Sequence, residues 1–376
     1  MRIKPFLVEE WMNAYENDAE INIAETCVNS ISMEELFEMS NIDIDEFIKE
    51  FASKRLTYGH IEGNPKFLDG ICNLYKKINP DDVVTTHGAI GANHHVFFSL
   101  IEPGDEVISI MPTYQQLYSI PEAYGADLKI LHLKKENNYL PDLEELKNLV
   151  TKNTKMICIN NPNNPTGALI SNEMLMEIIE IAKDSGAYIL CDEVYRNLVQ
   201  DEIYQESIVD LYEKGISVSS MSKIFSLAGI RLGWIATKDE DALKSFWIHR
   251  DYNHISCSMF DEEIGGIALS IYDKLLNRSK EIVQNNLKVL DDWINSQEHF
   301  SYVKPKAGTT ALVHYDFDKP SYEFCKELLE ETGDFVTPGA CFEIENSFRV
   351  GYAADKSDLI KGLKAIEEFS KKLVVK

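Results

Sequence analysis

The strongest constraint on how this chain folds is the alternation of short apolar runs with segments of helical periodicity. Seven runs have the length and composition of buried strands: DVVTT at 82–86, EVISI at 106–110, LKILHL at 128–133, KMICI at 155–159, AYILC at 187–191, ISVSS at 216–220 and GWIAT at 233–237. Most of the segments between them place apolar residues at i, i+3 and i+4. One such segment, 171–186, begins with Ser171, a helix-capping residue type, and ends at Gly186, a helix stop signal. Strands that alternate with helices predict an α/β fold, with a seven-stranded, mostly parallel sheet between helices.

A second, smaller unit is expected from the two ends of the chain. Long helical stretches occupy roughly 239–275 and 276–297, and FSYVKP, TALVHYDF and FRVGYA then have strand patterns, with a helix at 321–332 and another closing the chain. The first 45 residues show no strand–helix alternation and are expected to pack on this C-terminal unit. We therefore predict a large α/β domain over 46–275 and a smaller α+β domain from 1–45 with 276–376, covering the substrate site.

Charge and composition exclude several classes of partner. The chain carries 62 acidic against 37 basic side chains, a net charge of −25, which disfavours nucleic acid and anionic membrane surfaces. No run approaches the roughly 18 apolar residues of a membrane span, and the N-terminus has no apolar signal-peptide core. Seven scattered cysteines without a CxxC, and nine histidines without an HExxH, predict reduced thiols and no metal site. We expect a cytoplasmic protein.

Polar residues follow several of the predicted strands, at the sheet edge where parallel α/β proteins bind ligands. GAIGAN at 88–93 places a glycine before a helix, which suits a phosphate but also an ordinary strand–helix turn. NNPNNPTG at 160–167 is a rigid polar turn, with or without a ligand. Asp192 directly follows a buried strand, where a carboxylate needs a cationic or protonated partner unless it caps a helix.

The stretch SMSKIFSLAGIRLGW at 220–234 holds the residue of greatest chemical interest. Lys223 stands between hydroxyl residues at the end of a predicted strand, and Arg231 lies between two glycines eight residues later. A lysine that forms a Schiff base needs a lowered pKa, which desolvation or a nearby cation supplies. The arginine offers a planar anion-binding fork.

Together these motifs identify a resemblance. The chain resembles the class I/II aminotransferases of fold type I, which are aspartate aminotransferase-like enzymes dependent on pyridoxal 5′-phosphate (PLP). The resemblance runs from LTYGHIEGNPKFLDGI to FRVGYA and rests on NPNNPTG, DEVY and SxSKxxxLAGIRLGW.

By this resemblance, Lys223 forms the internal aldimine with PLP and moves the proton during catalysis. Asp192 would pair with the protonated pyridine nitrogen, while Asn164 and Tyr195 would hydrogen-bond the phenolic oxygen of the cofactor. The resemblance assigns the phosphate to the amides of Ala89 and Ile90, the hydroxyls of Ser220 and Ser222, and the guanidinium of Arg231.

The resemblance also implies how substrate and a second subunit are engaged. Tyr114 matches the aromatic residue that stacks on the cofactor ring, although an ordinary strand-end aromatic remains an alternative. Tyr58 resembles the tyrosine that reaches the phosphate of the neighbouring subunit, which implies a homodimer with shared active sites. Arg349, in SFRVGYA, resembles the arginine that binds the substrate α-carboxylate, with Asn164 beside it.

One segment departs from the family pattern. Where relatives carry a glycine in the N-terminal loop over the substrate, this chain has INIAETCVNSIS, with Glu25 and Thr26 in that region. One hypothesis is that Glu25 faces a cationic substrate side chain; the alternative is a solvated acid on a surface loop.

The sequence therefore predicts a PLP-dependent aminotransferase that moves an amino group from an L-amino acid to a 2-oxo acid. Relatives with the same cofactor residues include β-eliminating C–S lyases and capreomycidine synthase-like cyclases, so those reactions remain alternatives. A PLP-binding regulator is disfavoured, because the pattern starts within the first 60 residues and the net charge is −25.

Overall fold

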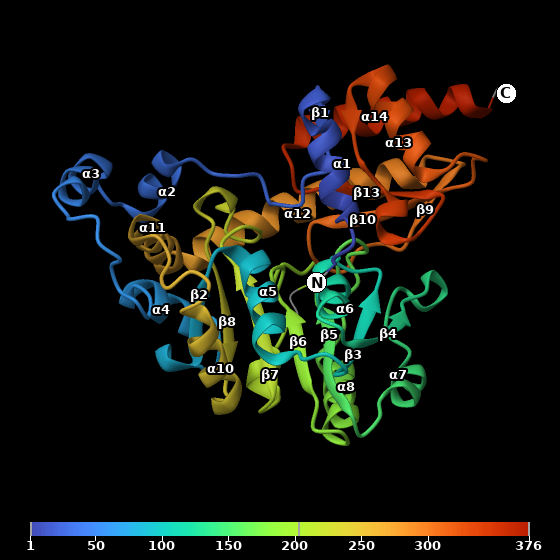
Figure 1. Ribbon diagram of the computed structural model, residues 1–376. Helices are drawn as coiled ribbons and strands as arrows, with labels where there is room; N and C mark the ends of the chain where they lie inside the picture. Colours follow the sequence, from blue (N-terminus) through green and yellow to red (C-terminus); the bar gives the residue numbers. More distant parts are fainter. Residues whose placement is uncertain (1, 202–203, 375–376) are drawn as a thin grey trace.

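The central sheet of the computed structural model, which describes residues 2–201 and 204–374, contains all seven runs predicted as strands. They are β2 (Val83–Thr86), β3 (Glu106–Met111), β4 (Asp127–His132), β5 (Thr154–Asn160), β6 (Tyr188–Asp192), β7 (Gly215–Ser220) and β8 (Gly233–Thr237). Their order is β2-β8-β7-β6-β5-β3-β4, and only β8 runs antiparallel to its two neighbours (Figure 1). The predicted seven-stranded, mostly parallel sheet is confirmed.

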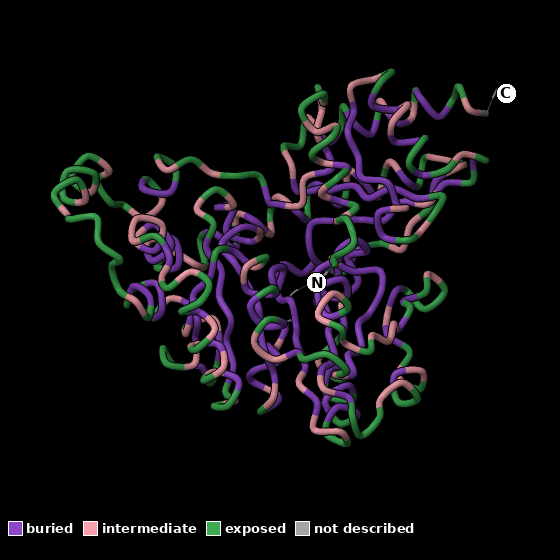
Figure 2. Tube along the Cα trace, in the orientation of Figure 1, coloured by how far each residue is buried: buried purple, intermediate pink, exposed green. Residues whose placement is uncertain are grey.

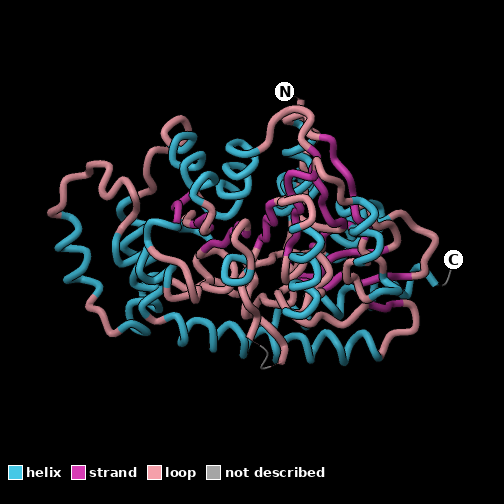
Figure 3. The backbone as a smooth tube through the Cα atoms, turned by 90° about the horizontal axis from the view of Figure 1, so that it is seen from below, coloured by secondary structure: helices cyan, strands magenta, loops and turns pink. Residues whose placement is uncertain are grey.

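Both faces of this sheet are buried, which explains why its strands are almost continuously apolar. In β5, Cys158 packs into the core on one face, while Ile157 and Ile159 pack into the core on the other. The first face is covered by α5 (Gly88–Leu100), α6 (Gln116–Ala123) and α10 (Glu240–Arg250). The second is covered by α4 (Pro65–Cys72), α7 (Leu143–Leu149), α8 (Asn172–Lys183), α9 (Ile208–Leu211) and α11 (Met259–Ser270). Figure 3 shows the strands enclosed by helices.

The helix predicted over 171–186 is confirmed with its cap. The side chain of Ser171 accepts a hydrogen bond from the Met174 amide, so one of the free N–H groups at the start of α8 is satisfied. The helix ends at Lys183, and Gly186 adopts a left-handed φ of 70° before β6 begins.

The helical stretch predicted over 239–275 is wrong as a continuous element. Helix α10 ends at Arg250, and α11 begins only at Met259. Between them Ile255 has a left-handed φ of 59°, and the Ser258 side chain accepts from the Asp261 amide to cap α11. The apolar spacing continues through 251–258, but Ser258 caps a new helix, so the chain forms two helices rather than one. The second stretch is a single helix, α12 (Tyr272–Asn295).

The C-terminal unit has its own antiparallel sheet. Its order is β12-β13-β10-β9, formed by β9 (Phe300–Tyr302), β10 (Thr310–Tyr315), β12 (Thr337–Pro338) and β13 (Ser347–Gly351). Helices α13 (Ser321–Thr332) and α14 (Lys356–Val374) accompany it. The N-terminal strand β1 (Ile21–Asn22) pairs in parallel with β11 (Asp334–Phe335), so an N-terminal segment joins the C-terminal unit, and Figure 1 shows β1 beside α14.

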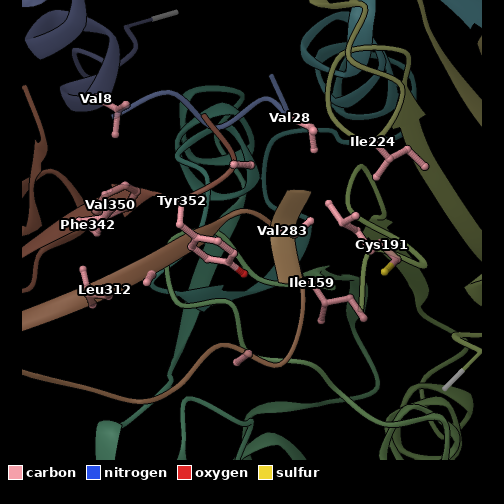
Figure 4. Close-up of a cluster of buried hydrophobic side chains, with 14 of the residues drawn as sticks. Val8, Val28, Ile159, Cys191, Ile224, Val283, Leu312, Phe342, Val350 and Tyr352 are labelled. Atoms are coloured by element: carbon pink, nitrogen blue, oxygen red, sulfur yellow. The ribbon is translucent and has the colours of Figure 1, made fainter. Parts of the chain in front are cut away.

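One apolar core is continuous between the large sheet and this C-terminal unit. Figure 4 shows Ile159 and Cys191 of the large sheet near Val283 of α12 and Leu312 and Val350 of the smaller sheet. The N-terminal residues contact both units, because α1 (Leu7–Tyr15) packs on β12 while α2 (Met33–Ser40) packs on α11. The domain limits at 45 and 275 stay a prediction.

A segment around α3 (Ile44–Ala52) projects from the rest of the chain, at the left of Figure 1. Figure 2 shows it largely exposed, and α3 itself has no buried residue. The extended stretch that follows leads to α4 and carries Leu56, 83% exposed, and Tyr58, 67% exposed. Exposed apolar side chains in a projecting segment are typical of a surface that another chain covers.

Two further predictions, reduced thiols and no membrane-spanning segment, can be compared with the structure. All seven cysteines are free, and all except the half-buried Cys72 are buried. Over 2–201 and 204–374, no helix combines the length and apolarity needed to cross a bilayer. The cytoplasmic location stays a prediction.

Gly233 offers a test of how β8 packs against α5. A Cβ at this position would lie 2.4 Å from the carbonyl carbon of Gly88 and 2.7 Å from the Ala89 amide nitrogen. Because backbone atoms cannot move aside, Gly233→Ala should lower the free energy of unfolding by about 2 to 3 kcal/mol. Gly229→Ala, where a Cβ meets nothing within 4 Å, is the matched control and should change it by no more than about 1 kcal/mol. Urea unfolding followed by circular dichroism measures both, and equal midpoints for the two variants would contradict this packing.

Candidate active site

A cavity of about 380 Å³ lies at the carboxyl ends of β5, β6 and β7, beneath the N-terminal residues. A cavity of this size suits a small-molecule site. It is lined by every site residue predicted from the sequence except Tyr58: Glu25, Ala89, Ile90, Tyr114, Asn164, Asp192, Tyr195, Ser220, Ser222, Lys223, Arg231 and Arg349. These residues come from distant parts of the chain, and the sheet edge brings them together.

Lys223 lies against the N-terminal loop. Its Nζ donates to Thr26 Oγ1 at 2.6 Å and to Cys27 Sγ at 3.5 Å. Burial alone would lower the pKa of Lys223, but the neighbouring Tyr195, Cys27 and Glu25 outweigh burial and raise the pKa above its ordinary value. A Schiff-base lysine needs a lowered pKa, and burial alone does not supply it here, because groups that carry negative charge when ionised surround the amine.

The same loop is fixed by backbone and side-chain contacts on both sides. Gly351 of β13 donates its amide to Ile23 O at 2.7 Å, and Thr309 Oγ1 donates to Thr26 O at 2.7 Å. The Val28 amide donates to the carbonyl of Lys223. The loop that departs from the family pattern is thus held against the lysine rather than free in solvent.

Asp192 is 4% exposed at the end of β6. Its Oδ2 accepts from Asn93 Nδ2 at 2.9 Å, and its Oδ1 accepts from the Val194 amide at 3.2 Å. The capping alternative thus accounts for only one carboxylate oxygen. Burial raises the pKa of Asp192 to about 6, although both hydrogen bonds and Lys223 oppose the shift. A cationic or protonated group in the cavity would favour the ionised form.

The asparagines of the polar turn divide into Asn161 and Asn163, which hold the turn together, and Asn160 and Asn164, which line the cavity. Asn161 exchanges two hydrogen bonds with the backbone of Ile170, and Asn163 Oδ1 accepts from the Thr166 hydroxyl. Asn160 Oδ1 accepts from the Asn164 amide at 2.7 Å. The turn therefore holds itself in one conformation and leaves the Asn164 side chain to line the cavity.

An anion cradle forms where α5 begins. The amides at a helix N-terminus are free donors, and Ala89 and Ile90 are the second and third residues of α5. Ser220 and Ser222, both buried, line the same part of the cavity. A Cβ on Gly88 would lie 2.9 Å from Arg231 Nη2, so the missing side chain leaves room for the guanidinium.

Arg349 is 3% exposed in β13, and its guanidinium is only partly satisfied. Nη2 donates to Ala24 O at 3.0 Å and to Thr337 Oγ1 at 3.1 Å, while Nη1 donates to Asn164 Oδ1 at 3.3 Å. Burial lowers the pKa of Arg349. Nε is buried and has no hydrogen-bond partner among the described residues. A buried N–H without a partner is costly, so this donor points to a ligand acceptor.

The two predicted aromatic residues lie in different places. Tyr114 lines the cavity, and its hydroxyl donates to Glu9 Oε1 at 3.0 Å. Tyr58 lies on the exposed segment before α4, outside this cavity, and its carbonyl accepts from Ser256 Oγ. Its predicted role toward a neighbouring subunit stays a prediction.

Several cavity residues were missed by the sequence reading. Among them are Val8, Glu9, Met12 and Asn13 of the N-terminal helix, Glu16 directly after it, and Cys27, Asn93 and Asn160. Asn93 could have been found, because it follows Ala89 by four residues and therefore shares its helix face. The residues of α1 could not be predicted in this way, because no sequence motif includes them.

The donor set fits a phosphate-bearing cofactor with a cationic ring and a group that reacts with an amine. The cradle at α5 can hold the phosphate, Asp192 can hold a protonated ring nitrogen, and Lys223 supplies the amine. Over the described ranges, 2–201 and 204–374, no group of three or more metal-ligating side chains is arranged to hold a metal ion.

Comparison with known proteins agrees with this geometry. The family described as aminotransferase class I and II matches residues 36–366. Capreomycidine synthase of Streptomyces vinaceus is 31% identical over 288 residues, covering 76% of this chain and 74% of the relative. Aspartate aminotransferase of Pyrococcus horikoshii is 30% identical over 350 residues, 87% of this chain and 88% of the relative. The crystal structure of a PLP-dependent aminotransferase from Streptococcus suis 89-1591 is 43% identical, with a TM-score of 0.96 and 99% of each chain covered.

Because its carboxylate is removed from water, ionised Asp192 should lower the stability of the folded protein. Since its native pKa of about 6 exceeds the ordinary 3.8, native protein binds more protons than unfolded chain between these values. Stability is therefore lost as pH rises from about 4 to about 6. In protein freed of small molecules, Asp192→Asn should raise the free energy of unfolding at pH 7.5 by about 3 kcal/mol.

The difference should vanish at pH 3.5, where both side chains are neutral. Urea unfolding at the two pH values measures it. The new amide nitrogen would face Asn93 Nδ2, which now donates to Asp192 Oδ2, so the Asn93 amide must turn over to present Oδ1 as the acceptor. Asn93 Nδ2 then takes the buried position in which Oδ1 had no partner. A variant that is less stable than the parent at pH 7.5 would show that Asp192 is not strained by burial.

Proposed function

The chain belongs to the class I and II aminotransferase family, whose members depend on PLP, and on that premise we propose that it transfers an amino group from an L-amino acid to a 2-oxo acid. The proposal rests mainly on one arrangement. Lys223, buried Asp192, the anion cradle at α5 and Arg349 with its free Nε all line one cavity.

The first role of these residues is to bind and orient PLP. Arg231, Ser220, Ser222 and the amides of Ala89 and Ile90 would hold the phosphate. Asp192 would hold the proton on the ring nitrogen, where ionisation of its carboxylate is favoured by the positive charge. Asn164 and Tyr195 would donate hydrogen bonds to the ring oxygen, and Tyr114 would cover one face of the ring.

The second role is proton transfer, which we assign to Lys223 Nζ. Bound PLP supplies an aldehyde carbon that takes up the amino group and a ring that accepts the electron pair left by the α-proton. Lys223 Nζ would remove that α-proton and return it to the cofactor carbon, acting as base and then as acid. Its side chain is held by Thr26 and Cys27, so the amine is kept near the reacting atoms.

Arg349 would bind the substrate α-carboxylate through its unpaired Nε. Ala24, Thr337 and Asn164 fix the other two guanidinium nitrogens, so the fork is oriented before substrate binds. A planar guanidinium suits a planar carboxylate, which makes lysine a poor replacement at this position.

The test of this function is a two-substrate assay. Purified protein saturated with PLP is incubated with single L-amino acids, and the visible absorption of the bound cofactor is recorded together with release of 2-oxo acid. We expect loss of the absorption band, equimolar 2-oxo acid, and recovery of the band when a second 2-oxo acid is added. Release of no 2-oxo acid from any donor would reject transamination.

Lys223→Ala should abolish both the lysine-dependent absorption band and turnover, lowering kcat by about a thousandfold or more. The Lys223 side chain is half-buried, whereas Lys152 is fully exposed, so Lys152→Ala is the matched control for loss of one lysine. Retention of the band in Lys223→Ala would show that another amine binds the cofactor.

A second reaction class stays open because capreomycidine synthase is among the relatives. A β-eliminating C–S lyase or a cyclase of that kind would use the same residues for the cofactor and for removal of the α-proton. The same incubation separates the classes, because β-elimination would release ammonia and thiol together with its 2-oxo acid, and a cyclase would release a cyclised amino acid. Neither reaction would pass the amino group to the second 2-oxo acid.

We also propose that the protein is a homodimer. The projecting segment exposes Leu56 and Tyr58, and Ile48 of α3 is 45% exposed beside them. A second apolar cavity, lined in part by Phe51, Leu56 and Phe260, opens on this surface. A second copy of the chain would cover these side chains and bring its Tyr58 to the cradle.

Sedimentation equilibrium should give twice the 42.9 kDa chain mass. Leu56→Asp should favour the monomer by placing a charge in the interface and should lower PLP affinity together with dimerisation. Ile360→Asp changes an exposed isoleucine on α14, away from this surface, and is the control. A monomer that is fully active and retains PLP would reject the shared site.

A further inference from the structure

The wall of the cavity that faces the cofactor residues is formed by one side of α1. Val8, Glu9, Met12, Asn13 and Glu16 all line the cavity. Their spacings of three, four and seven residues place them on the same side of the helix. Glu16 directly follows α1 and begins a short 3₁₀ turn, Glu16–Asp18. Two carboxylates, two helical turns apart, therefore face the same space.

The helix that carries them is firmly positioned. Trp11, 1% exposed, donates its indole N–H to Val336 O at 2.9 Å and stacks on Phe335 at 5.7 Å. The Gln115 side chain accepts from the Leu7 amide and donates to Pro5 O. Contacts to both the smaller unit and the large sheet thus fix the face that α1 presents to the cavity.

A third carboxylate lies across the cavity on the N-terminal loop. Glu25 is half-buried, and its Oε1 accepts from the Cys27 amide. Burial would raise the pKa of Glu25, but Lys223 and the hydrogen bonds with Cys27 outweigh burial and lower the pKa. The alternative of a solvated surface acid therefore does not describe Glu25.

Each cationic side chain that lines the cavity already has another role in the proposed function. They are Lys223, Arg231 and Arg349, which in the proposed function bind the cofactor aldehyde, the phosphate and the α-carboxylate. Over 2–201 and 204–374, no ion pair between protein side chains includes Glu9, Glu16 or Glu25. Once the cofactor and the substrate α-carboxylate are bound, the carboxylates of Glu9, Glu16 and Glu25 have no cationic partner among the side chains that line the cavity.

The unpaired Nε of Arg349 is the independent sign that a ligand carboxylate enters this cavity. An amino acid anchored there by its α-carboxylate extends its side chain through the remaining space, which Glu9, Glu16 and Glu25 line. A side chain with a terminal cation would meet three carboxylates, whereas an acidic side chain would be repelled by the same groups.

We propose that the amino donor is a basic L-amino acid whose terminal ammonium or guanidinium is bound by Glu9 of α1 and by Glu16 directly after it, with Glu25 adding to the negative charge of the cavity. The inference rests on the proposed function, because it assigns a substrate class to the same cavity. Glu9 also accepts the Tyr114 hydroxyl hydrogen bond, so the aromatic residue beside the ring orients the carboxylate. Glu9 and Glu16 are thus specificity-determining residues.

The experiment compares charged donors with neutral ones of similar shape on the PLP-saturated protein. L-arginine is paired with L-citrulline, and L-lysine with L-norleucine. Single-turnover kcat/KM comes from the absorption change, and Kd comes from spectral titration and from the rise of Tm on binding. We expect at least one cationic donor to exceed its neutral partner by about tenfold or more in kcat/KM.

Matched variants locate the effect on α1. Glu9→Gln and Glu16→Gln keep the shape of the side chains, and Glu9→Gln keeps an acceptor for Tyr114. Each should raise KM for the cationic donor by about tenfold and change the neutral donor by less than about twofold. Glu10→Gln, on the same helix but exposed and outside the cavity, removes the same charge and should leave both donors unchanged.

The outcomes separate this inference from the proposed function. Neutral or acidic donors that match or exceed the cationic ones, or variants that weaken both donors of a pair equally, would overturn the substrate class and leave transamination standing. Absence of 2-oxo acid from every donor would instead reject transamination. In that case the spectral and Tm titrations still decide whether the cavity prefers the cationic side chain.

Discussion

The burial of the Asp192 carboxylate at the end of a central strand is the constraint on which the rest of the site depends. A charge that far from water needs partners, and here they come from three elements: Asn93 of α5, the amide of Val194, and Lys223 after β7. Those contacts align the start of α5, the end of β6 and the lysine around one cavity. Removing this carboxylate from water costs stability. A positively charged ring bound in the cavity would reduce that cost, because it would favour the ionised carboxylate.

The continuous core between the two sheets gives the cavity its other wall. Because Ile159 and Cys191 pack in the same cluster as Val283 and Val350, the C-terminal sheet lies directly over the strand ends. Arg349 on β13 is thereby brought to Asn164 of the large sheet. The N-terminal loop passes between them, where it contacts Lys223. Cofactor residues and substrate residues thus come from different units, and the substrate side is completed by both chain ends.

Individual residues show how far sequence reasoning reaches. The seven strands were predicted because each is a short apolar run, and all seven form one sheet. Among the four asparagines of one turn, only the family resemblance singled out Asn164, since hydrogen bonding in the folded chain is what distinguishes the structural Asn161 and Asn163 from it. The raised pKa of Lys223 could not be inferred from its neighbours in the sequence, because Glu25 and Cys27 lie nearly two hundred positions away. Ser258 interrupted a helix whose apolar pattern continued past it.

The sequence by itself determined the α/β class and the seven strands, and it marked the residues that we propose to bind the cofactor, because these features depend on local periodicity and on motifs of fixed spacing. Only the tertiary structure decided what faces the substrate. Glu9 lies in α1 and Glu16 directly after it, and no motif marks either residue. Their proposed function depends on α1 packing through Trp11 against Phe335 and Val336, more than three hundred residues later. Such a contact leaves no local pattern, because its energy comes from burying surfaces that meet only when the chain has folded.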